Sequence, residues 1–307
     1  MEILITGISG YVGSRLVPVL QREGHSVRGI TRDPSRTAGR GLDVQIFTAD
    51  AVSGAGLDRA LEGVDVAYFL IHSMEPNTDG GFDARERAAA ENFAAAAGTA
   101  GVRRVIYLGG LVPTTGPASI HIASRLEVER ILLQASSESV AFRASIVVGA
   151  QNRSFRFLVR LVERLPVLLV PAWRNHLTQP IDERDMLELL ARAAENERIG
   201  GAALDIGGPD VVSYGELIDR IRHHMLVARP SISFKRLTVT PIASRISALI
   251  AGEQSELIGP LMESLATDLV VRDDRAAELL GVRLHSLDAA IEHALREWEA
   301  VEPLRAR

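Results

Sequence analysis

The chain has 307 residues, a formal net charge of −5 and a hydrophobic content of 47%, so it can bury one large domain or a domain with a smaller lobe. The acidic balance, with arginines scattered among carboxylates, argues against nucleic acid as a partner. The absence of cysteine excludes disulfides, thiolate catalysis and cysteine-bound metals.

No apolar run reaches the roughly 20 residues that a membrane-spanning helix needs. The first residues, Met-Glu-Ile-Leu-Ile, are too short and unflanked an apolar run to predict a signal peptide. His223 and His224 are adjacent and would face different ways on a helix, so no metal site is expected. We therefore expect a cytoplasmic protein without a membrane span, either a monomer or a homodimer.

A glycine-rich turn opens the chain. Gly7, Gly10 and Gly13 follow the apolar run 3–5 and lead into an amphipathic helix pattern at 11–23. Glycine lets the chain turn tightly and lets its backbone approach phosphate groups, and the start of the next helix attracts anions. A strand, three spaced glycines and a helix are typical of a turn that binds a dinucleotide pyrophosphate.

The first half of the chain alternates strand and helix patterns. This alternation predicts an α/β Rossmann fold, a doubly wound parallel sheet with right-handed crossovers, over residues 1–150. The further apolar runs that predict buried strands are 26–31, 44–48, 64–71, 104–108 and 142–148, and the helix patterns between them lie near 54–62, 83–100 and 120–136.

The pattern changes after Gly149, and residues 151–307 are predicted to form a smaller C-terminal α+β lobe that binds the substrate. Ser213 and Glu216 form a capping box that starts one of its helices. The other expected elements are helices near 153–165, 183–196, 242–265, 273–280 and 286–299 and a strand near 203–206 that returns to the sheet. Its large apolar residues favour a small apolar substrate, although most should be core: Phe155, Phe157, Leu168, Leu169 and Trp173.

Short motifs along nearly the whole chain carry a family resemblance. They are Thr6–Gly13, Arg32, Asp50-Ala51, 68–74, 91–93, 107–111, 124–127, 143–145, 179–181 and 205–209. With these motifs the chain resembles the extended and atypical short-chain dehydrogenases/reductases, in particular their NmrA-like branch. The resemblance implies an NAD(P) cofactor, but it does not fix the reaction, because one fold serves many functions.

The resemblance and the strand ends indicate which residues contact the cofactor. Asp50 fits a carboxylate that accepts from the adenine amine, and a turn-forming role is its alternative. For His72 a structural and a functional interpretation both stay open. The full predicted set, besides Arg32 and Arg125, is Gly7, Ser9, Gly10, Tyr11, Val12, Gly13, Asp50, Ala51, Leu70, Ile71, His72, Ser145 and Ile146.

The end of the second predicted strand favours NADP(H). Arg32 lies where a guanidinium can pair with a ribose 2′-phosphate, and Arg28 and Arg36 can assist it. A site that prefers NAD(H) has a carboxylate at this position. Asp33, the next residue, therefore keeps NAD(H) possible.

The usual catalytic residues of the resembled family are replaced. Those enzymes use a tyrosine followed four residues later by a lysine, and a serine after the fifth strand. Lys235 is the only lysine here, and none of the four tyrosines lies four residues before it. By alignment with the family, Arg125 takes the place of the lysine, His121 that of the tyrosine, and the pair Gly109-Gly110 that of the serine.

Arg125 can bind the nicotinamide ribose, and His121, one helical turn away, or His72 can supply a proton. The alternatives are an ion pair of Arg125 with Glu129 and a position of His121 outside the site. Three functions stay open. They are an NADP(H)-dependent oxidoreductase for a small apolar carbonyl, enone or quinone, a non-catalytic NADP(H)-binding sensor, and a redox-neutral enzyme that keeps NADP bound.

Overall fold

Seven parallel strands form the central sheet, in the order β11-β6-β5-β4-β1-β2-β3. The order changes direction between β1 and β4, which is the switch point of a doubly wound sheet. The strands are β1 Glu2–Thr6, β2 Ser26–Thr31, β3 Gln45–Thr48, β4 Val66–Phe69, β5 Arg104–Gly110, β6 Val140–Ala144 and β11 Ala203–Ile206. The computed structural model describes residues 1–37, 41, 43–71, 82–113, 120–164, 168–170, 172–227, 231–233 and 267–304.

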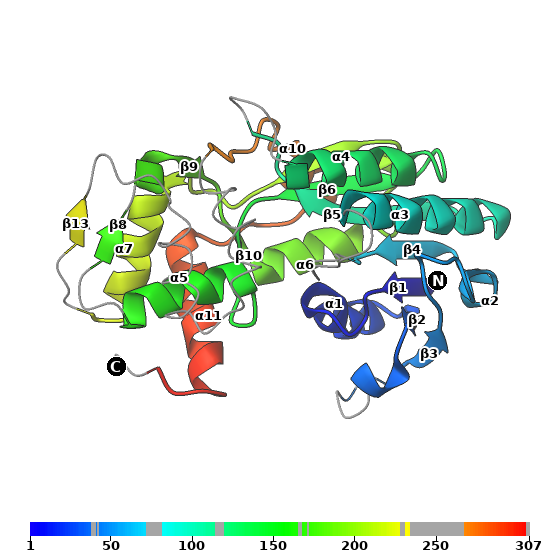
Figure 1. Cartoon of the computed structure of the whole chain (residues 1–307), viewed down its shortest axis with the longest axis horizontal. Helices are drawn as coiled ribbons and strands as arrows, with labels where there is room; N and C mark the ends of the chain where they lie inside the picture. The colour runs from blue at the N-terminus through cyan, green and yellow to red at the C-terminus, as the bar shows by residue number, and fades with distance from the viewer. Residues whose placement is uncertain are drawn as a thin grey trace.

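Helices cover both faces of this sheet (Figure 1). The apolar core on one face is filled from α1, α6 and α10, and the core on the other face from α2, α3 and α4. Because both faces are buried, the strands appear in the sequence as continuous apolar runs. The helices are α1 Tyr11–Arg22, α2 Leu57–Leu61, α3 Phe82–Thr99, α4 Ile120–Leu133, α6 Glu183–Arg192 and α10 Arg275–Leu280.

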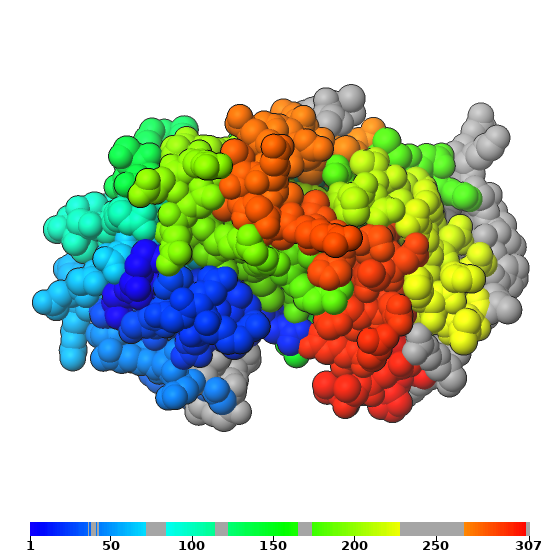
Figure 2. Space-filling model, turned by 180° about the vertical axis from the view of Figure 1, so that it is seen from behind, coloured from blue at the N-terminus to red at the C-terminus, as the bar shows by residue number. Residues whose placement is uncertain are grey.

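Besides the cores on the two faces of the sheet, the C-terminal half has an apolar core of its own, which we call the second core. It is built from α5 Arg153–Arg164, α7 Tyr214–His224 and α11 Leu287–Glu299. Figure 2 shows the C-terminal segment, orange to red, lying across the surface, where α10 packs on α6 and α11 packs on α7. Short strand pairs are β7 Val147–Val148 with β10 Ile181–Asp182, β9 Leu177–Thr178 with β12 Val212–Ser213, and β8 Leu168–Val170 with β13 Ser231–Ser233. Short 3₁₀ helices lie at Pro34–Arg36, Ala172–Asn175 and Glu197–Ile199.

The structure confirms the predicted Rossmann fold, including the return of residues 203–206 to the sheet as β11. The Ser213 hydroxyl accepts the N–H of Glu216 at 3.1 Å, so it caps α7 as predicted. The run 142–148 is divided, because β6 ends at Ala144 and β7 begins at Val147. The helix expected at 242–265 lies outside the described residues. Among the described helices, none has the length and apolarity for crossing a membrane.

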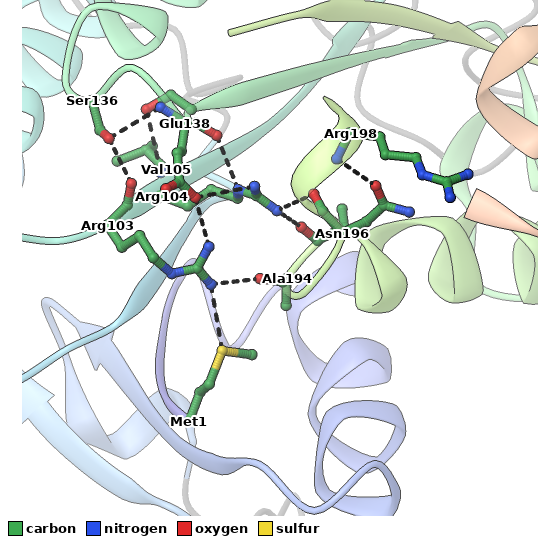
Figure 3. A network of polar contacts seen from close by, with 11 residues as sticks. Met1, Arg103, Arg104, Val105, Ser136, Glu138, Ala194, Asn196 and Arg198 are labelled. Carbon is green, nitrogen blue, oxygen red and sulfur yellow. Dashed lines mark hydrogen bonds and ion pairs between the residues drawn. The ribbon is translucent and has the colours of Figure 1, made fainter. Parts of the chain in front are cut away.

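Arg103 and Arg104, at the amino end of β5, form hydrogen bonds with the residues that follow α6 (Figure 3). Arg104 is fully buried and donates to the carbonyl oxygens of Asn196 at 2.8 Å and Glu138 at 2.9 Å, and also to that of Ala193. Arg103 pairs with the Glu138 carboxylate at 2.7 Å. Burial lowers the pKa of Arg104. These guanidinium groups supply donors to carbonyls that a helix end leaves unpaired.

Candidate functional site

The glycine turn between β1 and α1 packs against the residues that follow β4. Gly7 has a φ of +65°, and a Cβ on it would lie 2.7 Å from the carbonyl oxygen of Leu70. The N–H of Gly10 donates to the carbonyl oxygen of Gly7 at 2.8 Å, and a Cβ on Gly13 would lie 2.5 Å from that oxygen. The turn therefore accommodates only glycine at Gly7 and Gly13, and it brings the start of α1 to the switch point of the sheet.

The first turn of α1 presents backbone N–H groups that no side chain caps. Gly10 is its N-cap, and this turn has no acidic residue. Asp182, Ser213 and Ser286 cap α6, α7 and α11 by accepting a backbone N–H, whereas the short helices α2 and α10 also begin without a side-chain cap. An uncapped helix start fits a bound anion such as a pyrophosphate. The other predicted residues of this segment are Ser9 in the turn and Tyr11 and Val12 at the start of α1.

The chain after β4 is held to the glycine turn. The N–H of Leu70 donates to the Thr6 hydroxyl at 2.8 Å, and both residues are buried. Ile71 is half-buried. His72 lies outside the described residues, so its position stays a prediction. Leu70 and Ile71 thus border the turn as expected for residues beside a switch point.

The residues after β2 differ in what they contact. Arg32 is exposed and has no hydrogen bond or ion pair to any other described residue. The Asp33 carboxylate accepts the N–H and the hydroxyl of Ser35, at 3.0 and 2.6 Å. The side chain of Arg36 lies outside the described residues. The carboxylate is thus engaged in its own turn, whereas the guanidinium of Arg32 faces solvent.

Arg28, which the sequence suggested as an assistant to Arg32, is engaged elsewhere. Its Nε donates to the Glu2 carboxylate at 2.6 Å, and its Nη1 donates to the carbonyl of Glu62 at 3.0 Å. Its guanidinium also lies over the ring of Phe47, 5.4 Å from the centroid. These contacts hold sheet residues together and occupy the guanidinium.

Asp50 shapes the loop that follows β3. Its carboxylate accepts the N–H of Val52 at 2.9 Å, which is a turn-forming contact. The side-chain amide of Asn92 in α3 donates to the carbonyls of Ala51 at 3.1 Å and Val52 at 2.8 Å. The alternative role considered for Asp50 is therefore what this carboxylate does in the structure, and Asn92 fixes Ala51 in place.

Arg125 lies against the carboxyl end of β5. A Cβ on Gly110 would lie 3.3 Å from its Nη1. Burial raises the pKa of the Tyr107 phenol, and the nearby charge of Arg125 partly offsets this. Among the described residues, the half-buried Arg125 has no hydrogen bond and no ion pair. His121 belongs to α4, one turn earlier, but its side chain lies outside the described residues.

Glu129, the alternative partner considered for Arg125, binds a different arginine. Arg143 of β6 donates to both Glu129 carboxylate oxygens, at 2.8 Å from Nε and 2.6 Å from Nη2. Nη1 of Arg143 lies 3.6 Å from the Asp205 carboxylate. Glu129 is buried, and both its oxygens accept hydrogen bonds from Arg143, so it pairs with Arg143 and not with Arg125.

The residues between β6 and β7 are tied to the return of the chain from α5. The Ser145 hydroxyl donates to the carbonyl of Gln179 at 2.6 Å, and the carbonyl of Ile146 accepts the N–H of Ile181 at 3.0 Å. The Gln179 side chain donates to the carbonyl of Gly208 at 2.8 Å. Ser145 and Ile146 are thus fixed at the carboxyl edge of the sheet, where they were expected.

Sequence reasoning missed Glu183, which is buried at the start of α6 and accepts from both Tyr11 and Arg15 of α1. An acidic residue in the first turn of a helix normally indicates only a favourable helix dipole, and this hid the contact. Among the described residues, no cluster of histidine and carboxylate side chains could hold a metal ion.

The sheet order and the glycine turn define a Rossmann fold of the short-chain dehydrogenase/reductase type. A sequence model of the NmrA-like family matches residues 1–198, and the chain belongs to this family.

The relatives that are reductases by name include the following two. Ceramide reductase of Caulobacter vibrioides is 28% identical over 231 residues, which cover 75% of this chain and 72% of that protein. The (4-alkanoyl-5-oxo-2,5-dihydrofuran-3-yl)methyl phosphate reductase of Streptomyces griseus is 26% identical over 246 residues, which cover 80% of each chain.

Among solved structures, the NADPH-dependent quinone oxidoreductase of Escherichia coli complexed with NADPH has a TM-score of 0.74 to this chain, at 18% identity. The match covers 95% of this chain and 99% of that one. At this level of identity, the likeness shows the fold.

Proposed function

We propose that the protein is an NAD(P)H-dependent oxidoreductase that prefers NADP(H) and acts on a small apolar carbonyl, enone or quinone. The observation that carries the proposal is the uncapped start of α1 at the switch point of the sheet, formed by a turn with room only for glycine at two positions. The names of the reductases among its relatives support the same reaction class. The proposal includes a cytoplasmic location and a monomer or homodimer.

The cofactor in this proposal is held at two places along the carboxyl edge. The N–H groups of the first turn of α1 bind the pyrophosphate, and Arg125 binds the nicotinamide ribose through its several donors. Gly110 leaves the Arg125 guanidinium close to the end of β5. A bound nicotinamide dinucleotide supplies the hydride, so the protein's task is to orient the reactants and exclude water.

An arginine guanidinium is not a proton donor at neutral pH. The proposed proton source is therefore His121, His72 or water. We assign cofactor binding to residues 1–150 and substrate binding to the lobe 151–307. In that lobe, Phe155 and Phe157 are buried in the second core, as expected for most of its large apolar residues.

The first prediction concerns the choice of cofactor. Arg32 is exposed and without a described partner, while the Asp33 carboxylate is engaged in its own turn. One charge-assisted contact to a 2′-phosphate contributes about 1.5–3 kcal/mol, so NADPH should bind about 10- to 100-fold more tightly than NADH. In Arg32→Ala this preference should disappear and NADH affinity should stay unchanged.

Fluorescence titration with both nucleotides measures this preference. Arg59→Ala, at an exposed arginine of α2, is the matched control and should behave as the wild type. Equal affinities of the wild type for NADPH and NADH would reject the NADP(H) preference but leave dinucleotide binding intact.

The second prediction concerns the proton donor. His121→Phe should leave nucleotide binding intact and lower turnover by about 10²–10⁴-fold, the scale of a lost general acid. The wild-type pH–rate profile should bend near the ordinary imidazole pKa of about 6.5. The assay is NADPH oxidation with a panel of quinones, enones and aldehydes, and full activity in His121→Phe would leave His72 or water as the donor.

A non-catalytic NADP(H)-binding sensor is the second candidate function. The observation that favours it is that Ser231, not a tyrosine, stands four residues before the only lysine, Lys235. Tight NADPH binding with no turnover across the whole panel would replace the oxidoreductase by this sensor or by a redox-neutral enzyme.

A further inference from the structure

The side chain of Tyr11, the first residue of α1, reaches across to α6. Its hydroxyl donates to Oε2 of Glu183, and Nε of Arg15 donates to Oε1 of the same carboxylate at 2.7 Å. Glu183 is only 4% exposed, so both oxygens of a buried carboxylate are held by the first two turns of α1. Burial, and after it the charge of Glu183, raises the pKa of the Tyr11 phenol, which keeps the hydroxyl a donor.

The same contact also meets the chain where it leaves the sheet. A Cβ on Gly149 would overlap both the Tyr11 hydroxyl and the Glu183 carboxylate. Gly149 follows β7 directly, and the chain continues from it into α5 of the second core. The Tyr11–Glu183 contact therefore lies where the glycine-turn helix, α6 and the entry to the second core come together.

Arg15 extends this contact to the last helix. It forms an ion pair with Glu297 of α11, a helix that packs in the second core. In Figure 2 the blue N-terminal part of the surface meets the red C-terminal helix, in agreement with this pair. Four residues thus connect the helix that follows the glycine turn with elements of the second core: Tyr11, Arg15, Glu183 and Glu297.

We propose that Tyr11 and Glu183 are positioning residues. They hold the first turn of α1 so that its N–H groups face the dinucleotide, and they fix the position of this turn relative to the second core. Tyr11 is the first residue of that turn, so holding its side chain fixes the backbone donors beside it. The hydroxyl acts through Glu183 and not on the cofactor. The inference rests on the proposed function in one respect, namely that the ligand of α1 is a dinucleotide.

The test compares two tyrosines that lose the same group. Tyr68 of β4 is fully buried, and its hydroxyl donates to the carbonyl of Leu190 at 2.8 Å. Leu190 belongs to α6, the helix that also contains Glu183. Both Tyr68→Phe and Tyr11→Phe should therefore lower Tm, Tyr11→Phe by more because its hydroxyl donates to a charged carboxylate. Only Tyr11→Phe should raise the Kd for NADPH, by about tenfold, because only Tyr11 belongs to the turn that binds the anion.

Glu183→Gln serves as the second variant and decides the matter if Tyr11→Phe does not fold. It should weaken NADPH binding to a similar extent. The double variant should have the same NADPH affinity as the single variant that binds NADPH less tightly, because the two residues act as one unit. In turnover assays, both single variants should raise the KM for NADPH and leave kcat near the wild-type value.

Calorimetric titration with NADPH separates the outcomes. If Tyr11→Phe and Glu183→Gln bind NADPH as tightly as Tyr68→Phe, the positioning role is rejected and the proposed function stands. If the wild type binds neither NADPH nor NADH, the proposed function and this inference fall together.

Discussion

An arginine lies at each end of strand β5, and the two have opposite surroundings. At its first residue, Arg104 is fully buried and donates to carbonyl oxygens of Ala193, Asn196 and Glu138 (Figure 3). Beyond its last residue, Gly110, the guanidinium of Arg125 has no hydrogen bond or ion pair within the described part of the chain. One arginine completes the structure, and the other is left available to a ligand.

The position of each arginine in the sheet explains the difference. The amino end of β5 meets the end of α6, where helix carbonyls need donors, and Arg104 supplies them. The carboxyl ends of the strands form the crevice in which sheets of this type bind ligands. A guanidinium without hydrogen-bond partners is therefore destabilising at the amino edge of the sheet, whereas at the carboxyl edge it can bind a ligand.

The largest expected effect lies at the amino edge. Arg104→Met keeps most of the side-chain volume but removes the donors from the buried carbonyl oxygen of Ala193 and from the part-buried ones of Asn196 and Glu138, which should lower the free energy of unfolding by about 3–5 kcal/mol. Urea denaturation measures this change. The fraction that remains folded should bind NADPH as the wild type does, and weakened binding at full stability would contradict the purely structural role of Arg104.

A smaller effect is expected at Arg143, which lies toward the carboxyl edge but is engaged by Glu129 and Asp205. Its side chain is 22% exposed, so solvent can replace part of what Arg143→Met removes. Loss of its charge-assisted hydrogen bonds should lower the free energy of unfolding by about 1.5–3 kcal/mol. A stability loss as large as that of Arg104→Met would show that depth in the sheet does not govern the cost.

Much of the fold could be predicted because hydrophobic periodicity is local. The alternating strand and helix patterns and the glycine turn led to β1–β6, β11 and the helices around them, with bounds that differ by a few residues. The cap at Ser213 was also local, since it joins residues three apart. Such features need no knowledge of the rest of the chain.

The candidate site was less predictable because its side chains choose partners from distant segments. The spacing of Arg125 and Glu129 allows an ion pair on one helix, yet Glu129 pairs with Arg143 on a neighbouring strand. Tyr11 and Glu183 are 172 residues apart and no local pattern connects them. Competition between long-range partners decides which charges remain available, and a single sequence does not display that competition.

NADPH titration of Arg125→Met, together with its urea denaturation, tests the difference between the two ends of β5 most directly. Methionine keeps an apolar stem of similar length and removes the charge. We expect about tenfold weaker NADPH binding and a change in unfolding free energy within about 0.5 kcal/mol, because no described residue loses a partner. Unchanged affinity for NADPH, or a loss of stability comparable with that of Arg104→Met, would contradict the assignment of the carboxyl end of β5 to cofactor binding.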